Sequence, residues 1–325
     1  MNRRRIAIGV SAVSGVAMVG AGALSLLGSG GATAATPKLT PIAAVQAAAG
    51  ATEKAQTAEV DTVVTMTTPA TAAKGATPAA PAKSTTMHGT GLFDFGREIG
   101  KIDLTMANGG LQEVLTPSSL YLRTAPPGAP AAGGTSSTSG KGWSRIDISR
   151  LSDGNLISGG STDPVMALAM LGGTAPDVRY LGQDVVRDVA VSHYQGTLDL
   201  AVAANAAVPP RDAAAAANAA ADKKALTNAS HAFVSAKVPF DLYLDADGRV
   251  RRFAAKFSFV VPGPGKGAAE VTSTTDLYGF GIPVGVSTPS APAPASSAGK
   301  PAGTSTAPAT PSAPGTPSPS RSAHK

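Results

Sequence analysis

Residues 237–261 restrict the fold of this chain more than any other stretch. Phe240 and Leu242 alternate with polar residues ahead of Asp247-Gly248, a dipeptide typical of tight hairpin turns. A two-residue loop at that dipeptide would place Leu242 opposite Phe253, with one face of the hairpin apolar and the other charged. This pattern is typical of an antiparallel sheet that has one face toward water and the other toward a core.

Strand patterns recur along much of the chain. Residues 176–200 are predicted to form two extended segments joined by a polar turn and followed by an alanine-rich helix. Asn108-Gly109 adds a second hairpin signal. Other segments favour strands because they are rich in β-branched residues or alternate apolar with polar positions; they are 58–68, 84–95, 100–107, 111–115, 120–123, 143–148 and 269–278. The sequence therefore predicts an antiparallel meander of many strands.

Helices are predicted at few places. Asp163-Pro164 is a helix start, with Asp as the capping residue and Pro at the first helical position. Residues 165–171 (VMALAML) follow without one polar side chain. A two-turn helix that is apolar all round is covered on most sides, or else one side faces a cavity filled by something apolar. Residues 41–56 and 201–229 are alanine-rich and suit further helices.

Residues 1–34 have the features of an export signal. Arg3, Arg4 and Arg5 precede an uncharged run, and Ala32-Thr33-Ala34 fits the small-x-small cleavage pattern. The alternative is an uncleaved N-terminal membrane anchor, because an uncharged run of this length can span a bilayer. Its many glycine and serine residues lower the hydrophobicity and favour cleavage, so we expect a secreted or cell-envelope protein.

One folded domain is expected, at residues 35–286. Residues 287–325 are mostly Pro, Ala, Ser and Thr, which predicts a disordered tail. The chain has 27 basic and 21 acidic residues, but six of the basic ones lie in the export segment and the tail. The formal charge of +6 therefore does not indicate a basic face on the domain, and we expect no nucleic-acid partner.

No arrangement typical of catalysis is present in the sequence. Cysteine is absent, which excludes disulfides, thiolate metal sites and a Cys nucleophile. The Gly-x-Ser-x-Gly nucleophile elbow is missing, and none of the four His has a second His at metal-ligand spacing. His193 is expected to be a surface or edge residue of a strand. We therefore expect a protein that is not an enzyme and needs no metal or other cofactor.

Several short motifs along the chain resemble those of one protein family. The motifs are GLFDF at 91–95, LYLR at 120–123, GWSRID at 142–147, LGQD at 181–184, HYQGTLDL at 193–200, VPF at 238–240 and YLDADGR at 243–249. In this order they resemble the LppX/LprG-type envelope proteins of actinobacteria, and the resemblance covers about residues 43–278. Two features depart from the family: Ala34 and Ala35 stand where a lipobox Cys is usual, and the Pro-rich tail is not usual. The first departure favours a soluble secreted form.

The resemblance implies an α+β fold like that of the lipoprotein carriers LolA and LolB. An antiparallel curved sheet forms an open half-barrel in that fold, and helices cover its concave face. Relatives hold acyl chains in an apolar cavity between the two layers and carry or present lipids in the bacterial cell envelope. The resemblance therefore implies a lipid or another amphiphile as the partner of this chain.

The cavity is expected between the apolar helix and the apolar face of the 237–261 hairpin. Met166 and Met170 lie four residues apart on one helix face, where flexible thioethers suit an adaptable lipid contact; plain core packing is the alternative. The full expected lining comes from both elements: Val165, Met166, Ala169, Met170, Phe240, Leu242, Phe253 and Phe257.

A second function remains open from the sequence. In it the cavity is collapsed, and a non-enzymatic structural or interaction protein of the envelope acts through its sheet edge or its tail. The partner would then be a membrane surface or a cell-wall component.

Overall fold

The computed structural model describes residues 39–70, 81–107, 109–125, 142–156, 163–206, 213–260 and 268–290. The expected export segment and the part of the expected tail beyond residue 290 lie outside the described residues, as does Asn108 of the second hairpin signal. The expected domain boundaries stay predictions.

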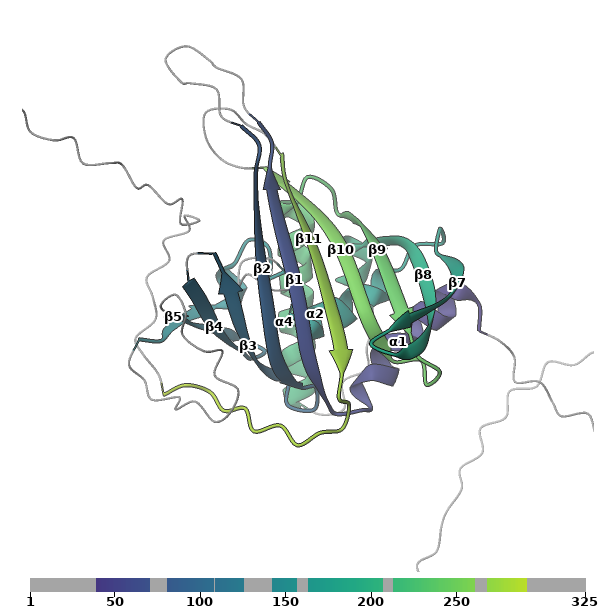
Figure 1. Ribbon diagram of the computed structural model, residues 1–325, viewed down its shortest axis with the longest axis horizontal. Helices are drawn as coiled ribbons and strands as arrows, with labels where there is room; N and C mark the ends of the chain where they lie inside the picture. Colours follow the sequence, from purple (N-terminus) through teal and green to yellow (C-terminus); the bar gives the residue numbers. More distant parts are fainter. Residues whose placement is uncertain are drawn as a thin grey trace, which may run out of the picture. The chain divides into compact units, whose positions relative to one another are not determined.

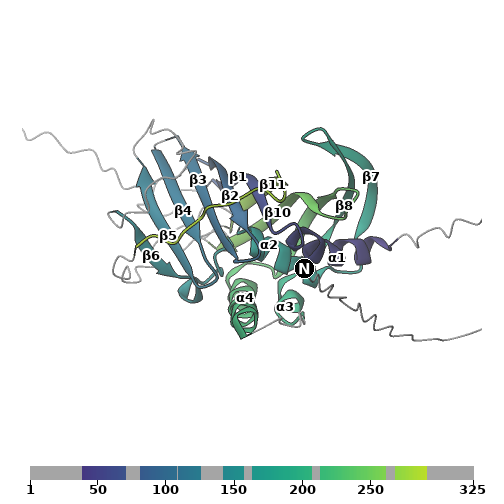
Figure 2. The same cartoon turned by 90° about the horizontal axis from the view of Figure 1, so that it is seen from below.

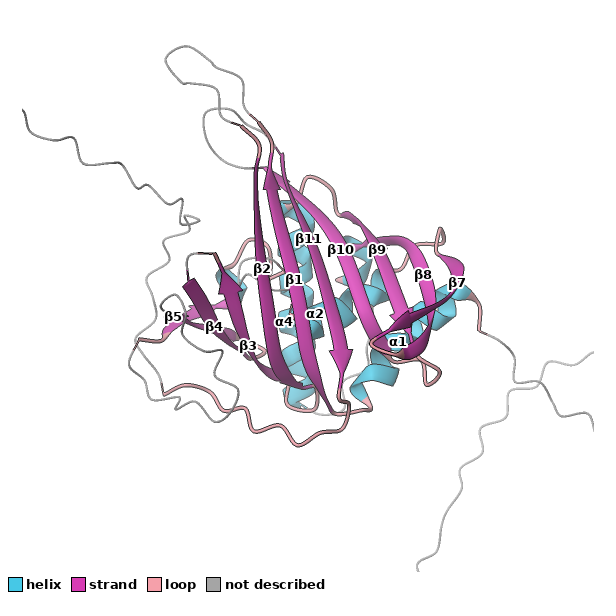
Figure 3. Ribbon diagram, in the orientation of Figure 1, coloured by secondary structure: helices cyan, strands magenta, loops and turns pink. Residues whose placement is uncertain are grey.

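Within the described residues, eleven strands form one antiparallel sheet, shown in Figures 1 and 3. They are β1 (Thr57–Thr68), β2 (Lys83–Asp94), β3 (Ile99–Met106), β4 (Gly109–Leu115), β5 (Ser119–Ala125), β6 (Ser144–Asp147), β7 (Arg179–Val186), β8 (Val189–Asp199), β9 (Lys237–Leu244), β10 (Val250–Val260) and β11 (Ala268–Tyr278). Their order is β6-β5-β4-β3-β2-β1-β11-β10-β9-β8-β7, so the sheet is open, with β6 and β7 as its edges. The first and last strands of the chain meet in its middle, where β1 pairs with β11.

Four α-helices lie within the described ranges, all on one face of the sheet (Figure 2). They are α1 (Pro41–Glu53), α2 (Pro164–Met170), α3 (Leu200–Ala203) and α4 (Ala213–Ala232); short 3₁₀ turns, η1 (Ile148–Arg150) and η2 (Leu171–Gly173), accompany them. We call the helix-covered side of the sheet the inner face and the opposite side the outer face. The expected α+β class, an open antiparallel sheet with helices on one face, is confirmed.

The register predicted for the β9–β10 hairpin is confirmed, although its loop is not the expected one. Leu242 lies opposite Phe253, as predicted. The loop, however, runs from Asp245 to Arg249 rather than over two residues, because the Asp245 carboxylate accepts the N–H of Arg249 and widens the turn. A β-bulge between Val250 and Arg252 adds one residue to β10 and restores the alternation.

α1 is fixed to the sheet by a buried threonine. Thr40 caps the helix, Pro41 occupies the first position, and the helix ends at Glu53 rather than at Gln56 as expected. Thr52, which is fully buried, donates to the Ala48 carbonyl and accepts the N–H of Val250 at the start of β10. The hydroxyl thus satisfies a backbone donor where the hairpin loop meets the helix layer.

Candidate functional site

α2 is the helix predicted to form the cavity wall, and it is buried on nearly every side. Its predicted start is confirmed, because the Asp163 carboxylate accepts the Val165 N–H at 2.9 Å and Pro164 follows. Only Val165 and Ala169 among its seven residues are partly exposed. α2 contacts α1, α3 and α4, and its sequence carries no charged side chain. It therefore occupies the middle of the apolar layer between the sheet and the other helices.

A narrow gap separates α2 from the centre of the sheet. Its free volume is about 10 Å³, which is at the lower limit for one water molecule. The helix side and the sheet side both line it with apolar groups: Pro164, Ala167, Leu168, Leu171, Leu242, Val250, Phe253, Thr275 and Leu277. In this state α2 fills the space against the described strands rather than facing an open chamber.

The eight residues expected to line a cavity belong to one apolar cluster but not to one hollow. Leu242 and Phe253 line the gap under α2, whereas Val165 and Met166 line a second gap toward α4. Phe240 stacks on Phe253 with ring centroids 6.4 Å apart. Phe257 instead packs against Phe233, with ring centroids 5.2 Å apart.

The two methionines of α2 are core residues in this structure. Met166 is 3% exposed and Met170 is fully buried, while Ala169 packs at the margin of the same cluster. Core packing, the alternative for these methionines, thus accounts for their positions in the described state. Contact with a lipid stays a prediction that requires α2 to move.

Three carboxylates meet in the second gap, which has a volume of about 20 Å³. Glu98 comes from the β2–β3 turn, Asp163 from the start of α2 and Asp222 from α4. Burial raises the pKa of Asp163 to about 6. Burial, followed by the nearby charges of Asp163 and Glu98, raises the pKa of Asp222 to about 7. Burial and the charge of Asp163 also raise the pKa of Glu98, against a lowering hydrogen bond from Asn218.

The sequence gives no sign of this carboxylate cluster. Its members are separated by more than fifty residues along the chain, and Asp163 is recognisable only as a helix cap. The packing of α4 against α2 and η1 brings them together. The interior of the helix layer is therefore less uniformly apolar than the helix sequences indicate.

The outer face carries a network of charged side chains centred on Asp276 of β11. Arg252 of β10 donates two hydrogen bonds to its carboxylate, at 2.6 and 2.8 Å. Arg187, at the tip of the β7–β8 hairpin, donates a third at 3.1 Å and also pairs with Asp61 of β1. The hairpin tip therefore lies against the central strands on the outer face, held by hydrogen bonds between opposite charges.

His193 was expected to be a surface or an edge residue, and it lies on the outer face of a strand that is not an edge. Its strand, β8, pairs with β7 on one side and with β9 on the other. The His193 Nε2 lies 2.7 Å from the Asp241 carboxylate, and the ring stacks on Tyr243 with centroids 4.2 Å apart. These contacts join β8 to β9 on the outer face, which is a structural role.

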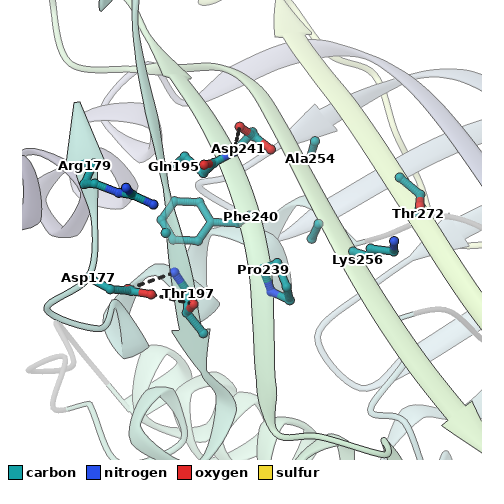
Figure 4. A pocket seen from close by; sticks show the side chains of 12 residues that line it. Asp177, Arg179, Gln195, Thr197, Pro239, Phe240, Asp241, Ala254, Lys256 and Thr272 are labelled. Atoms are coloured by element: carbon teal, nitrogen blue, oxygen red, sulfur yellow. Dashed lines mark hydrogen bonds between the residues drawn. The ribbon is translucent and has the colours of Figure 1, made fainter. Parts of the chain in front are cut away.

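Figure 4 shows an open hollow on the outer face, with a volume of about 470 Å³. It lies where β9 and β10 stop pairing, next to Pro239, which has no N–H to continue the ladder. Its carboxylates are already engaged: Asp177 accepts two hydrogen bonds from Thr197, and Asp241 accepts one from Gln195. An open hollow with charged side chains in its wall does not suit an acyl chain.

Two further findings concern the described residues alone. No group of three or more His, Asp or Glu side chains in these ranges is arranged to hold a metal ion. None of the helices within them combines the length and the apolar composition that a membrane span requires.

Comparisons with known proteins give structural matches only. No protein-family model matches the sequence, and no curated protein matches it. The lipoprotein LppX of Mycobacterium tuberculosis matches with a TM-score of 0.40 and 12% identity, over 76% of this chain and 98% of LppX. LprF from Mycobacterium bovis matches with a TM-score of 0.35 and 14% identity, over 77% of this chain and 97% of LprF.

A LolA superfamily protein from Nitrosomonas europaea matches with a TM-score of 0.24 and 10% identity, over 74% of this chain and 92% of that protein. The architecture of the described residues, an open antiparallel sheet with helices on one face, agrees with the expected half-barrel. Membership of the LppX/LprG-type family stays a prediction from the motifs.

Proposed function

We propose that this chain is an exported binding protein that carries or presents a lipid or another amphiphile between its sheet and its helices. Binding is non-covalent and needs no cofactor. The acyl chain enters the apolar layer and takes over contacts that α2 now makes with the sheet. The eight predicted lining residues are the contacts we assign to it: Val165, Met166, Ala169, Met170, Phe240, Leu242, Phe253 and Phe257.

The observation that carries the proposal is the composition and position of α2. A seven-residue helix without one polar side chain separates the apolar face of β9 and β10 from α4. So short a helix has little stability of its own and depends on its apolar contacts. An acyl chain can replace such contacts at about 0.8 kcal/mol for each buried methylene, so displacement of α2 is energetically feasible.

Native mass spectrometry of the chain purified from its own host tests this proposal. The expected result is an added mass in the range of a lipid, which leaves on organic extraction and returns when the lipid is added back. The proposal would be contradicted if the spectrum showed only the mass of the protein and host lipids did not raise its melting temperature.

A pair of valine variants then locates the site. Val165 is partly buried on α2, whereas Val63 is 40% exposed on the outer face of β1. Val165→Asp should lower lipid capture at least about tenfold, because a charge enters the apolar layer. Val63→Asp should leave capture unchanged. Equal capture by both folded variants would show that α2 is not part of the site.

A second candidate function has one observation in its favour, which is the volume of only about 10 Å³ under α2. In this candidate the layer stays closed, and the chain acts as an interaction protein through an edge of its sheet. A protein that never carries lipid but forms a specific complex through β6 or β7 would support it over the first.

A further inference from the structure

β7 is an edge strand of the sheet. Among the described strands it pairs with β8 alone, and α1 also contacts it. Three of the eight large apolar side chains that are exposed in the described ranges belong to it: Tyr180 at 41%, Leu181 at 50% and Val185 at 62%. Unpaired backbone groups would be costly in the hydrocarbon of a membrane, so this edge suits another strand better than a bilayer.

A β-bulge places two opposite charges on the same side of β7. Tyr180 lies opposite Tyr194 and Gly182 lies opposite His193, so Leu181 is an extra residue. In a regular strand, residues five apart point to opposite faces. The extra residue of the bulge shifts the alternation by one position. Arg179 and Asp184 therefore both lie on the outer face, opposite Gln195 and Val191 respectively.

Neither charge forms a direct ion pair with another described residue, although the hydrogen bond to Asp276 and, more weakly, the charge of Asp184 raise the pKa of Arg252. The Arg179 side chain extends over the hollow in Figure 4, where the described residues give it no ion pair. Asp184 uses one oxygen to accept the Val185 N–H and forms no ion pair with a described residue. The outer face of β7 therefore carries one cation and one carboxylate, neither of which is in a direct ion pair with a described residue.

We propose that β7 pairs with β7 of a second copy of this chain, antiparallel, about a two-fold axis between Leu181 and Gly182. Arg179 then lies opposite Asp184 of the second copy, and the symmetry repeats this pair. Tyr180 lies opposite Gln183 of the second copy on the inner face. Because both strands carry the same bulge at the axis, inner residues meet inner residues and outer residues meet outer ones. Such a two-fold interface is self-complementary, and opposite charges in facing positions stabilise paired strands.

The chain's own tail is a poorer occupant of this edge. Residues 291–325 contain no acidic residue that could pair with Arg179, and their many prolines lack the N–H that a ladder requires. The inference deepens the second candidate function, and it does not depend on whether the helix layer takes a lipid.

Cysteine cross-linking tests the register directly, because the chain has no cysteine of its own. Arg179→Cys combined with Asp184→Cys should give a disulfide-linked dimer on mild oxidation, since facing residues have Cβ atoms about 4.5–5.5 Å apart. The two positions of one strand are about 16 Å apart and cannot bond to each other. A mixture of the two single variants should cross-link as well. Either single variant alone should not, and cross-linking of the single variants to the same extent would overturn the register.

Charge reversal tests the same interface in solution, with sedimentation velocity as the measurement. Arg179→Asp and Asp184→Arg should each weaken the dimer about tenfold or more, because like charges then face each other twice. The double variant that exchanges the two charges should restore it. Lys83→Asp makes the same change at an exposed position of β2 and should have no effect.

Three results would overturn the proposal. The first is a monomer at every concentration up to about 0.1 mM, where even a weak dimer should appear. The second is a dimer that Arg179→Asp leaves unchanged, which would place the interface elsewhere. The third is a monomer whose β7 amides are protected from hydrogen exchange, which would show that another segment of the same chain covers the edge.

Discussion

The two faces of the sheet are stabilised in different ways. On the inner face, Phe240, Leu242, Phe253 and Phe257 are at most 4% exposed and pack against helices and against one another. On the outer face, the strands are connected by charged side chains around Asp276. Apolar burial has no preferred direction, whereas hydrogen bonds between charged groups require defined geometry.

This difference suggests separate tasks for the two faces. The inner face holds most of the buried apolar side chains, and lipid binding would require it to exchange one apolar neighbour for another. The outer face fixes where the β7–β8 hairpin lies, because Arg187 reaches carboxylates on two central strands at once. Edge strand β7 is thus held in place by the outer face, whereas any ligand would occupy the inner one.

The largest expected effect comes from removing inner-face volume. Phe257→Ala should lower the free energy of unfolding by about 3–5 kcal/mol, because the side chain is 1% exposed and the cavity left beside Phe233 cannot close fully. Val260→Ala, on the same strand but at a residue that is 56% exposed, should change it by less than about 0.5 kcal/mol. Urea unfolding measures both. If both variants lost a similar free energy of unfolding, burial on the inner face would not be the main source of stability in this strand.

The central carboxylate of the outer face should rank second. Asp276→Asn should lower the free energy of unfolding by about 1–3 kcal/mol, because Arg187 and Arg252 lose their shared charge partner while remaining partly exposed to water. Glu270→Gln is the control, since its pair with Lys256 is about half exposed and is worth less than about 0.5 kcal/mol. An Asp276→Asn variant as stable as the unaltered chain would mean that the network contributes little.

The smallest expected effect is on the pH dependence of stability. It tests the inner side of the comparison, because Asp163 and Asp222 bring charge into the helix layer. The raised pKa values of Asp163 and Asp222 mean that the folded state holds protons that the unfolded state releases. Stability should therefore fall as the pH rises from about 4 to about 7 and then level off. Asp222→Asn should flatten this dependence and add on the order of 1–2 kcal/mol at pH 8.

Asp163→Asn is the companion variant for this pH dependence, since Asn still caps α2 while removing the charge. It should flatten the dependence in the same direction. Urea unfolding midpoints of each variant and of the unaltered chain, measured at pH 5 and pH 8, test this prediction. A pH dependence identical in the Asp222→Asn variant and the unaltered chain would contradict the burial of that carboxylate.

Local patterns in the sequence predicted most of the elements. Most strands lie within a residue or two of the expected ranges, and α2 begins at the Asp163-Pro164 pair. The pairing of Leu242 with Phe253 also follows from the alternation alone. These features depend on residues a few positions apart, whose φ/ψ preferences and side-chain directions act within one strand or helix turn.

The candidate site was predicted less completely. The eight expected lining residues do fall in one apolar cluster, because each lies on the apolar side of its element. The narrowness of the gap under α2 and the carboxylates of Glu98, Asp163 and Asp222 were not predicted. The ion pairs of Arg187 with Asp61 and Asp276 were not predicted either.

The sequence by itself determined the antiparallel strands, the apolar faces and the cap of α2. Only the tertiary structure decided that β1 meets β11, that β7 is an edge, and on which face Arg187 lies. The reason is the separation of the partners: Asp61 and Asp276 stand more than two hundred residues apart, and no short-range pattern encodes their meeting. Such contacts form when whole elements exclude water together, and the register of the complete sheet then fixes which side chains face each other.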